Sequence, residues 1–350
     1  MYQSRTERAK SYFFNMRRFH NNVKRQLYDK YTKNIDKLLD LACGKGGDLD
    51  KWVSNNIKHV IGYDINEKSI IEAQRRVNEY RNPTNTKVEV YVKDLSRNVI
   101  EGNKDCDVVT SMFAFHYFFE SEETFNTIMK TIDNNLKMDG YFIGAMFDGE
   151  HISNLVKESG NFELVDDNKV RFKIKRYGKL SKSLFGNKLS VFLNETVLDE
   201  PMDEYVVYFD LFINEMRKRG YELVESKLFD EEYNVKYNLN DLEKRISFLN
   251  RTFVFKRTGV ILTLPQVCVE ETDYLIECKW PSSKKDKLIE KYKKALSLKA
   301  QESNGILKEG YLYLMDNFER AEELMDDPMV DSYLRKYLKD IYEIFKKQLK

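Results

Sequence analysis

The sequence has few cysteines and histidines and no long hydrophobic run. Its 350 residues include four cysteines and four histidines, and no cysteine has a CxxC partner or a histidine close by. This scarcity argues against a zinc site and indicates reduced thiols. No apolar stretch reaches about 18 residues, and the first residues lack an apolar signal segment, so we predict neither a membrane span nor secretion. The expectation is an intracellular protein without a bound metal.

The sequence also lacks the motifs of covalent and acid–base catalysis. It contains no Gly-x-Ser-x-Gly, no pairing of a cysteine with a histidine, and no pair of acids beside a base. We therefore expect no residue to act as a covalent or acid–base catalyst.

Charge is balanced overall but uneven along the chain. The net charge of +1 gives by itself no sign of a polyanionic partner. Residues 1–37, however, carry ten lysines and arginines against three acids. The basic N-terminal segment over 1–36, expected to be helical over about 5–33, has the charge to contact phosphates. A solvated helix face would show the same pattern.

Strand and helix patterns alternate after this segment. Apolar runs typical of buried strands lie at 37–42, 58–63, 87–92, 105–112 and 140–146. Amphipathic helical patterns lie between them at 47–56, 67–80 and 121–137. Such alternation predicts an α/β fold with a parallel sheet, helices on both faces and ligands at the carboxyl ends of the strands.

Further segments extend this domain. Apolar runs at 221–229 and 251–257 could complete the sheet, and an insert over 150–215 contains short strand-like pieces. We place the main α/β domain over 37–258. Residues 259–350 form a C-terminal α/β extension of unknown role, in which apolar residues recur at helical spacing.

A glycine-rich loop follows the first predicted strand, in the segment LDLACGKGGD over residues 39–48. Glycines let a ligand lie against the backbone, and the helix that follows offers unpaired N–H groups. Asp64 comes twenty residues after Gly44, at the end of the second predicted strand, where an acid can bind ribose hydroxyls. The two features predict a cofactor that carries a nucleoside.

The charges of this loop distinguish two such cofactors. A dinucleotide fold favours G-x-G-x-x-G, and negative charge beside the pyrophosphate would repel it. Here Asp40 precedes the turn and Asp48 follows it, which suits the sulfonium and amino groups of S-adenosylmethionine. The loop therefore favours a methyltransferase over a nicotinamide-dependent dehydrogenase.

Later segments add polar and aromatic groups at strand ends. Asp94 follows the third strand, where it could accept from an adenine amino group or cap a turn before Ser96. Residues 111–120, SMFAFHYFFE, place aromatic rings and a histidine where a flat base could stack. Glu204 could accept from N1 and N2 of guanine, although a surface acid is the simpler interpretation of that residue alone.

Five segments in order resemble the mRNA cap guanine-N7 methyltransferases. They are RRFHNNVK (17–24), LDLACGKGGDLDKW (39–52), FAFHY (113–117), EY (204–205) and NRTFVFK (250–256). The resemblance spans about residues 12–258. It implies a Rossmann-like S-adenosylmethionine-dependent methyltransferase fold and methyl transfer from S-adenosylmethionine to N7 of the 5′-terminal guanosine cap of mRNA.

The resemblance also implies roles for matching residues. The expected cofactor contacts are Lys24, Asp40, Ala42, Gly44, Asp64, Asp94, Met112 and Tyr117. The expected cap contacts are His20, Asn21, Lys45, Lys51, Arg76, Phe113, His116, Tyr117, Glu204 and Asn250. Lys45 and Lys51 are interpreted as the cap-facing side of the loop.

Three positions depart from the family pattern. Ala42 replaces a glycine, which is tolerable if its φ stays negative. Met112 stands where glutamine is common, and Asn250 takes the place of a tyrosine. Two alternatives therefore stay open: a methyltransferase for another substrate, and a cap- or RNA-binding module that has lost catalysis.

The implied chemistry explains the missing catalytic motifs. Guanine N7 carries a lone pair and no proton, so its attack on a sulfonium methyl group needs no general base. In-line placement and electrostatics are then the main requirements.

Two short motifs suggest other enzymes but have no supporting pattern. Residues 137–140, KMDG, match the KxDG of nucleotidyl-transferring capping enzymes. Residues 277–279, ECK, resemble an E-x-K nuclease strand, but Asp273 lies too close to it.

The resemblance also implies partners and a location. Capped RNA is the expected substrate, and other capping-enzyme domains or a stimulatory subunit are candidate partners. A cellular enzyme would work in the nucleus and a viral one in the host cytoplasm. The abundance of Lys, Asn and Tyr favours a viral relative.

Overall fold

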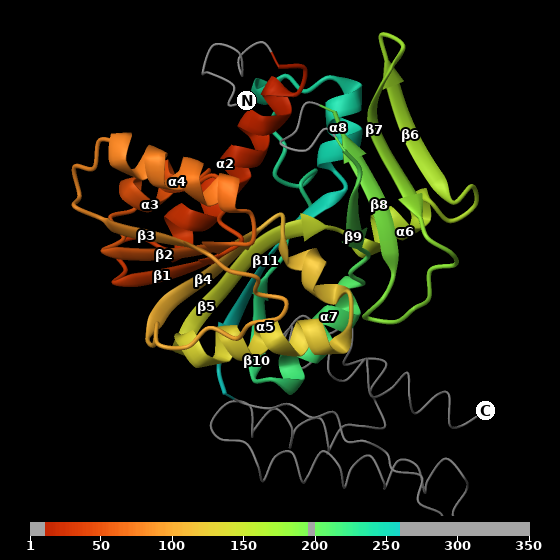
Figure 1. Ribbon diagram of the computed structural model, residues 1–350. Helices are drawn as coiled ribbons and strands as arrows, with labels where there is room; N and C mark the ends of the chain where they lie inside the picture. The colour runs from red at the N-terminus through yellow and green to blue at the C-terminus, as the bar shows by residue number, and fades with distance from the viewer. Residues whose placement is uncertain (1–10, 195–199, 260–350) are drawn as a thin grey trace, which may run out of the picture. The chain divides into compact units, whose positions relative to one another are not determined.

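The computed structural model describes residues 11–194 and 200–259 of the chain (Figure 1). Its centre is a seven-stranded sheet in the order β10-β11-β5-β4-β1-β2-β3. The strands are β1 (Lys37–Leu41), β2 (His59–Asp64), β3 (Lys87–Val92), β4 (Cys106–Met112), β5 (Leu136–Phe147), β10 (Tyr221–Glu225) and β11 (Asn250–Arg257). Strands β1 to β5 run parallel, and β11 is antiparallel to both of its neighbours, β5 and β10.

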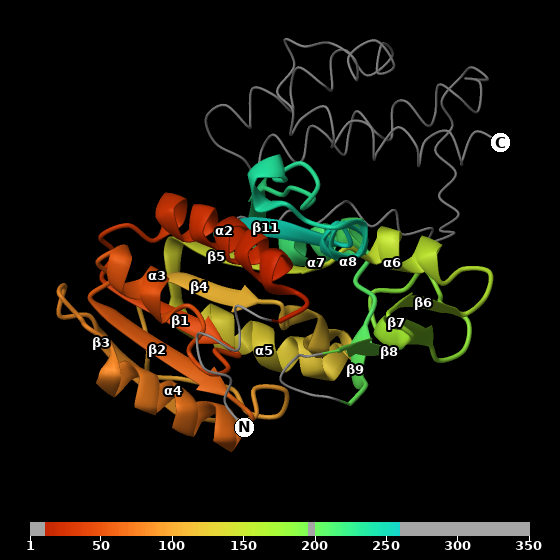
Figure 2. The same ribbon diagram turned by 90° about the horizontal axis from the view of Figure 1, so that it is seen from above.

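Helices cover both faces of this sheet (Figures 1 and 2). Successive residues of a strand point to opposite faces, so Leu38 packs under one layer of helices and Leu39 under the other. The first layer consists of α2 (Phe14–Tyr31), α3 (Leu49–Ser54) and α4 (Glu67–Glu79), and the second of α5 (Glu122–Asn135) and α7 (Phe209–Lys218). In sheets of this kind, ligands bind at the carboxyl ends of the parallel strands.

A second sheet stands beside the first (Figure 1). Its strands are β6 (Asn161–Asp166), β7 (Lys169–Arg176), β8 (Lys188–Leu193) and β9 (Met202–Tyr205), and all of its pairings are antiparallel. The remaining elements are η1 (Phe115–Phe119), α6 (Gly149–Leu155), η2 (Val235–Tyr237) and α8 (Asp241–Ser247). A second core unites this sheet with α2, α6 and α8.

Most predicted elements are confirmed within the described residues. All seven predicted strands are present, although the run at 221–229 pairs only over Tyr221–Glu225. The helix predicted over 121–137 ends at Asn135 because β5 begins at Leu136. The described part of the N-terminal helix is α2. The proposed boundaries at 36 and 258 stay predictions, and residues 260–350 lie outside the described residues.

One buried carboxylate caps two helices. The first turn of α2 has no side-chain cap of its own, and the N–H of Met16 donates instead to Glu243 Oε1 at 2.9 Å. The other oxygen, Oε2, accepts from the backbone N–H of Asn240 at 3.1 Å in the capping box of α8. Glu243 is buried. It therefore fixes the start of α2 relative to α8.

We expect Glu243→Ala to lower the free energy of unfolding by about 2–4 kcal/mol, because two buried helix termini lose their acceptor at once. Equilibrium urea denaturation measures the change. Asp241→Ala is the matched control, since this acid on the same helix is almost fully exposed. A loss no larger than that of the control would contradict the shared cap.

Candidate active site

The glycine-rich loop between β1 and α3 borders on open space. A Cβ atom built at Gly44 or Gly47 would meet no atom within 4 Å, so a ligand can approach the backbone there. Ala42 has a φ of 64°. The condition of a negative φ, under which alanine was called tolerable here, is therefore not met: the turn needs a left-handed residue, which costs alanine roughly 1–2 kcal/mol and glycine almost nothing.

Asp64 lies at the end of β2 beside this loop. Its carboxylate accepts from the N–H of Gly44 and from the N–H of Asn66, each at 2.8 Å. The side chain is half-buried, and the next residue, Ile65, exposes 66% of its surface. Two backbone N–H groups of the protein thus already donate to this carboxylate. Its place still suits a ribose, with an apolar side chain next to it for a base.

Asp48 joins two lysines in an ionic cluster at the start of α3. Its Oδ1 lies 2.6 Å from Lys24 Nζ and 2.8 Å from Lys51 Nζ. Burial alone would raise the pKa of Asp48, but the two ammonium groups hold this pKa below its usual value. Lys51 exposes only 1% of its side chain. The prediction that Lys51 faces the cap is therefore wrong, whereas Lys24, from α2, does reach the loop.

Asp40 is buried in β1 rather than exposed in the loop. Its Oδ2 lies 3.5 Å from the hydroxyl of Tyr28. Burial, followed by the charge of Asp48, raises the pKa of Asp40 well above its usual value. The contact predicted between Asp40 and the cofactor stays a prediction.

Asp94 follows β3 and caps a turn. Its Oδ1 accepts from the N–H of Ser96 at 2.9 Å and from the Ser96 hydroxyl at 2.5 Å. The turn-cap alternative is therefore correct for this oxygen. Oδ2 lies 3.7 Å from Arg97 Nε, and its contact with an adenine amino group stays a prediction. Met112, at the end of β4, is half-buried and packs with the core beneath α2.

A histidine and an acid face each other across the two sheets. His116 Nε2, from η1, lies 3.2 Å from Glu204 Oε2, from β9. The two atoms do not form a hydrogen bond. Both ring nitrogens of His116 and Glu204 Oε2 thus have no hydrogen-bond partner among the described residues. Buried polar atoms normally have partners. Unsatisfied groups at this point are therefore ready for a polar ligand.

Burial sets the protonation of this pair. It lowers the pKa of His116 to about 3, which leaves a neutral imidazole. It raises the pKa of Glu204 to about 8, against a smaller opposing effect of a hydrogen bond from Tyr117. Burial also raises the pKa of Tyr117.

His20, from α2, and Phe113, three residues before His116, form a stacked pair. Their ring centroids are 5.4 Å apart with an interplanar angle of 18°. Phe229 packs edge-on against both rings. His20 also lies 2.9 Å from the hydroxyl of Ser247 through Nε2. Burial, with the nearby charge of Lys24, lowers the pKa of His20 to about 3, so this ring is neutral as well.

The remaining predicted cap residues differ in availability. Asn21 is exposed and Lys45 half-buried. Arg76 pairs with Glu72 at 2.9 Å on α4. Asn250 is 3% exposed and donates to the carbonyl oxygens of Ile246 and Ser247 at the end of α8. The cap contact predicted for Asn250 is therefore incorrect, because its amide group closes a helix.

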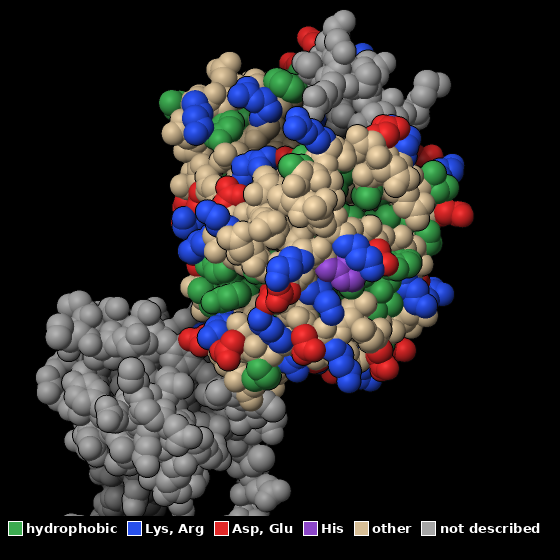
Figure 3. Space-filling model, turned by 90° about the vertical axis from the view of Figure 1, so that its left-hand side faces the viewer, with side chains coloured by type: hydrophobic (Ala, Val, Ile, Leu, Met, Phe, Trp, Pro, Cys, Tyr) green, Lys and Arg blue, Asp and Glu red, His purple; other side chains and the backbone are tan. Residues whose placement is uncertain are grey.

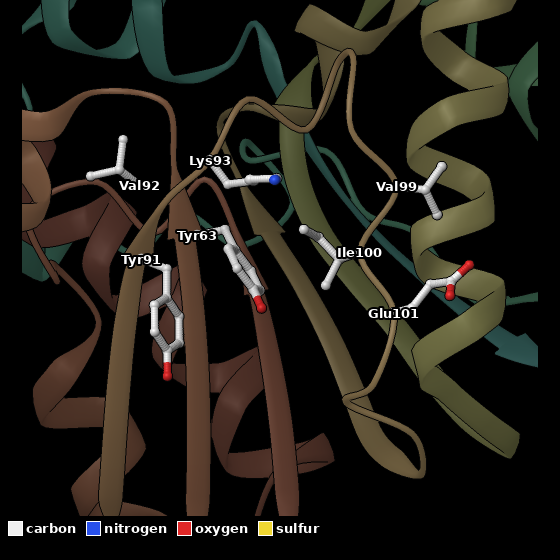
Figure 4. A pocket seen from close by; sticks show the side chains of 7 residues that line it. All are labelled: Tyr63, Tyr91, Val92, Lys93, Val99, Ile100 and Glu101. Carbon is white, nitrogen blue, oxygen red and sulfur yellow. The ribbon is translucent and has the colours of Figure 1, made fainter.

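An open hollow of about 410 Å³ lies next to the ends of β2 and β3 (Figure 4). Tyr63 and Tyr91 line it from neighbouring strands, with Val92, Lys93 and residues 99–101 along its rim. Tyr63 packs with the core on the α5 face, whereas Lys24 and Asp48 lie on the α2 face. The hollow exists because residues 93–105 join β3 to β4 without a helix. It contains none of the predicted site residues.

Surface charge is mixed on the side of the molecule that Figure 3 shows, which is the left-hand side of Figure 1. Lysines and arginines are interspersed with acids there, and no large surface of one sign appears. Among residues 11–194 and 200–259, no three His, Cys, Asp or Glu residues gather as metal ligands. No helix in the same ranges is long and apolar enough to cross a membrane. The KxDG match at 137–140 lies at the amino end of β5, where Lys137 pairs with Asp107, and is remote from the loop.

Sequence reasoning missed three residues of the site. Asp48 was expected to place its charge beside the cofactor, but its pairing with Lys24 and Lys51 carried no signal in the sequence. Ser247 and Phe229, which support His20, come from segments more than 200 residues away and carry no local signal.

The sheet order, the reversed strand β11 and the loop beside Asp64 define a Rossmann-like α/β fold of the methyltransferase type that the sequence predicts. The chain belongs to the mRNA (guanine-N(7))-methyltransferase domain family, whose model matches residues 1–320.

The chain is also similar to individual curated proteins and solved structures. An mRNA cap guanine-N(7) methyltransferase of Eremothecium gossypii is 33% identical over 253 residues, which cover 66% of this chain and 58% of the relative. A probable mRNA-capping enzyme of Acanthamoeba polyphaga mimivirus is 26% identical, over 79% of this chain and 30% of its own. A putative S-adenosylmethionine-dependent methyltransferase from Listeria monocytogenes aligns with 69% of this chain and 98% of its own at a TM-score of 0.49 and 19% identity. The chain thus spans little more than half the length of the curated relative that it matches first.

Proposed function

We propose that this chain transfers a methyl group from S-adenosylmethionine to N7 of the guanosine cap of mRNA. The observation that carries the proposal is the buried, unsatisfied carboxylate oxygen of Glu204 beside neutral His116. Guanine presents donors at N1 and N2 together, a pair that neither adenine nor a pyrimidine offers. An ionised Glu204 accepts from both donors, and His116 can supply one further hydrogen bond.

The loop supports the cofactor part of the proposal. Open space beside Gly44, the carboxylate of Asp64 and exposed Ile65 suit a nucleoside with its ribose and base. When bound, S-adenosylmethionine supplies the methyl group on its sulfonium. Lys24, Gly44 and Asp64 are the residues that would hold it, with Asp94, Met112 and Tyr117 as further candidate contacts.

The residues of this chain position the reactants and exclude water. Guanine N7 has no proton to lose, so neither His116 nor Glu204 needs to act as a base. Glu204 fixes the orientation of the guanine edge, and the His20–Phe113 pair offers aromatic surface close by. Orientation of this kind can supply several kcal/mol of the barrier reduction. The carboxylate also favours the positive charge that guanine gains.

Selectivity for guanine tests the proposal. The cap dinucleotide GpppG should compete with capped RNA and inhibit its methylation, whereas ApppA, which contains no guanine, should not. Equal inhibition by both would favour a methyltransferase for another substrate.

We expect kcat/KM for capped RNA to rise about tenfold per pH unit between pH 6 and 7.5 and to level off above pH 8. The pKa of Glu204 lies near 8, and only the ionised carboxylate accepts from N1 and N2. Cap binding therefore requires loss of a proton below pH 8, and its affinity falls as pH falls. Cofactor affinity in the same buffers is the control. A flat profile for the cap would contradict the role of Glu204.

The remaining parts of the proposal concern surroundings and partners. Capped RNA is the substrate, and Lys45 and Arg76 are candidate phosphate contacts. Other capping-enzyme domains or a stimulatory subunit are candidate partners. A role in mRNA capping places the chain inside the cell, in the nucleus or, for a viral enzyme, in the host cytoplasm.

A further inference from the structure

Helix α2 contacts both halves of the site (Figure 2). Towards its start, Met16 donates to Glu243 of α8, and His20 lies against Ser247 of the same helix. Towards its end, Lys24 pairs with Asp48 beside the loop, and Arg25 pairs with Asp50 of α3. Because His20 and Lys24 are four residues apart, they lie on one side of α2. The helix thus carries two candidate cap residues, His20 and Asn21, and one candidate cofactor residue, Lys24.

Lys51 is the buried cation at the junction of α2 and the loop. Its ammonium group lies 2.8 Å from Asp48 Oδ1 and 3.6 Å from Asp50 Oδ1. It also donates to Asn21 Oδ1 of α2 at 3.1 Å. The ammonium group of Lys51 therefore binds Asp48, which also pairs with Lys24, and Asn21, which follows His20 in α2.

Stability alone does not explain a charge at this position. Removing an ammonium group from water is expensive, and an apolar side chain of similar volume often stabilises a fold equally well or better. A buried ion pair can instead fix the position of one element relative to another, because the buried charge is stable only where its partner atoms lie within bonding distance. At this junction the two elements are α2 and the glycine-rich loop.

We propose that Lys51 is a positioning residue: its ammonium group fastens α2 to the glycine-rich loop through Asn21 and Asp48, and so holds Lys24 and His20 in place for the cofactor and the cap. The inference deepens the proposed function, since it assigns the placement of both substrates to one buried group that touches neither.

Three variants test the inference. Lys51→Met removes the charge and keeps the length of the side chain, Lys51→Arg keeps the charge, and Lys58→Met is the matched control. Lys58 also pairs with an acid, Asp36, but both side chains are exposed. Hydrogen exchange of the amides of residues 18–25 reports on α2, and calorimetry gives the dissociation constant of the cofactor. Steady-state kinetics separate KM for the cap from kcat.

In Lys51→Met we expect exchange of residues 18–25 to accelerate at least tenfold and cofactor Kd and cap KM each to rise about tenfold. The kcat at saturating substrate should change less than threefold, because bound cofactor and cap return α2 to its position in the parent chain. Lys51→Arg should return exchange to within threefold of the parent chain, and Lys58→Met should change none of these values. A lower melting temperature with unchanged exchange, Kd and KM would overturn the inference, since a merely structural residue gives that result.

A further variant keeps the test valid if Lys51→Met does not fold. Asn21→Ala removes only the acceptor on α2, at an exposed position, and should still accelerate exchange and raise cofactor Kd severalfold. Wild-type values for both would overturn the inference. If the parent chain methylates no capped RNA, the proposed function fails, whereas exchange and cofactor Kd still decide the role of Lys51.

Discussion

Glu204→Ala should lower kcat/KM for capped RNA by about 10³-fold or more, which corresponds to about 4 kcal/mol. The variant removes the only acceptor that we assign to N1 and N2 of guanine and leaves those donors unpaired in a buried site. Glu204→Gln should be almost as inactive, because its amide N–H₂ would meet guanine donors. Activity assays on GpppN-capped RNA measure both losses.

The cofactor affinity of these variants is the essential control. Glu204 comes from β9 of the second sheet, whereas the loop and Asp64 belong to the first. Calorimetric Kd for S-adenosylmethionine should therefore stay within twofold of the parent value. Loss of cofactor binding in Glu204→Ala would remove the assigned role and suggest a general collapse of the site.

Asp64→Ala should have the opposite effect, with cofactor Kd raised about 50- to 100-fold. The carboxylate is the candidate acceptor for the ribose hydroxyls, and it also holds the N–H of Gly44 at 2.8 Å. Loss of both interactions corresponds to about 2.5 kcal/mol. Isothermal titration calorimetry with S-adenosylmethionine measures the change.

Glu67→Ala is the matched control for Asp64→Ala. Glu67 is an exposed acid three residues further along, in the first turn of α4. Its removal should leave cofactor affinity unchanged. Unchanged affinity in Asp64→Ala itself would refute the ribose assignment. At saturating cofactor, KM for the cap should stay near the parent value in both variants.

The local pattern of apolar residues was enough to predict the strands and helices that carry this site. Buried strands read clearly because apolar runs such as 37–42 are covered on both faces. The spacing of Gly44 and Asp64 follows from a βαβ unit, so their meeting at one edge of the sheet was predictable. The observed 2.8 Å contact between them confirms this geometry.

The burial of Lys51 and of Asp40 depends on contacts that local sequence does not reveal. Lys51 appeared exposed because most lysines are, but α2 covers it from 30 residues away. Asp40 lies in a buried strand, and the charge that raises its pKa further, Asp48, is eight residues away in the sequence. Asn250 is different, since it bonds carbonyl groups three and four residues back, a local helix-end pattern that could have been read.

Ala42 shows the limit of a conformational argument from residue type. Alanine argued for a negative φ, yet the turn imposes 64°. The loop geometry is set by the strand before it, the helix after it and the hydrogen bond that the N–H of Gly44 donates to Asp64. Together these outweigh the preference of alanine for a negative φ, which is worth roughly 1–2 kcal/mol.

Transfer of a labelled methyl group from S-adenosylmethionine to GpppN-capped RNA, with identification of the methylated atom in the digested product, tests the central claim most directly. We expect label only on capped RNA, all of it at N7 of the terminal guanosine. Equal labelling of uncapped RNA, methylation at another atom, or cap binding without any transfer would contradict the proposed function.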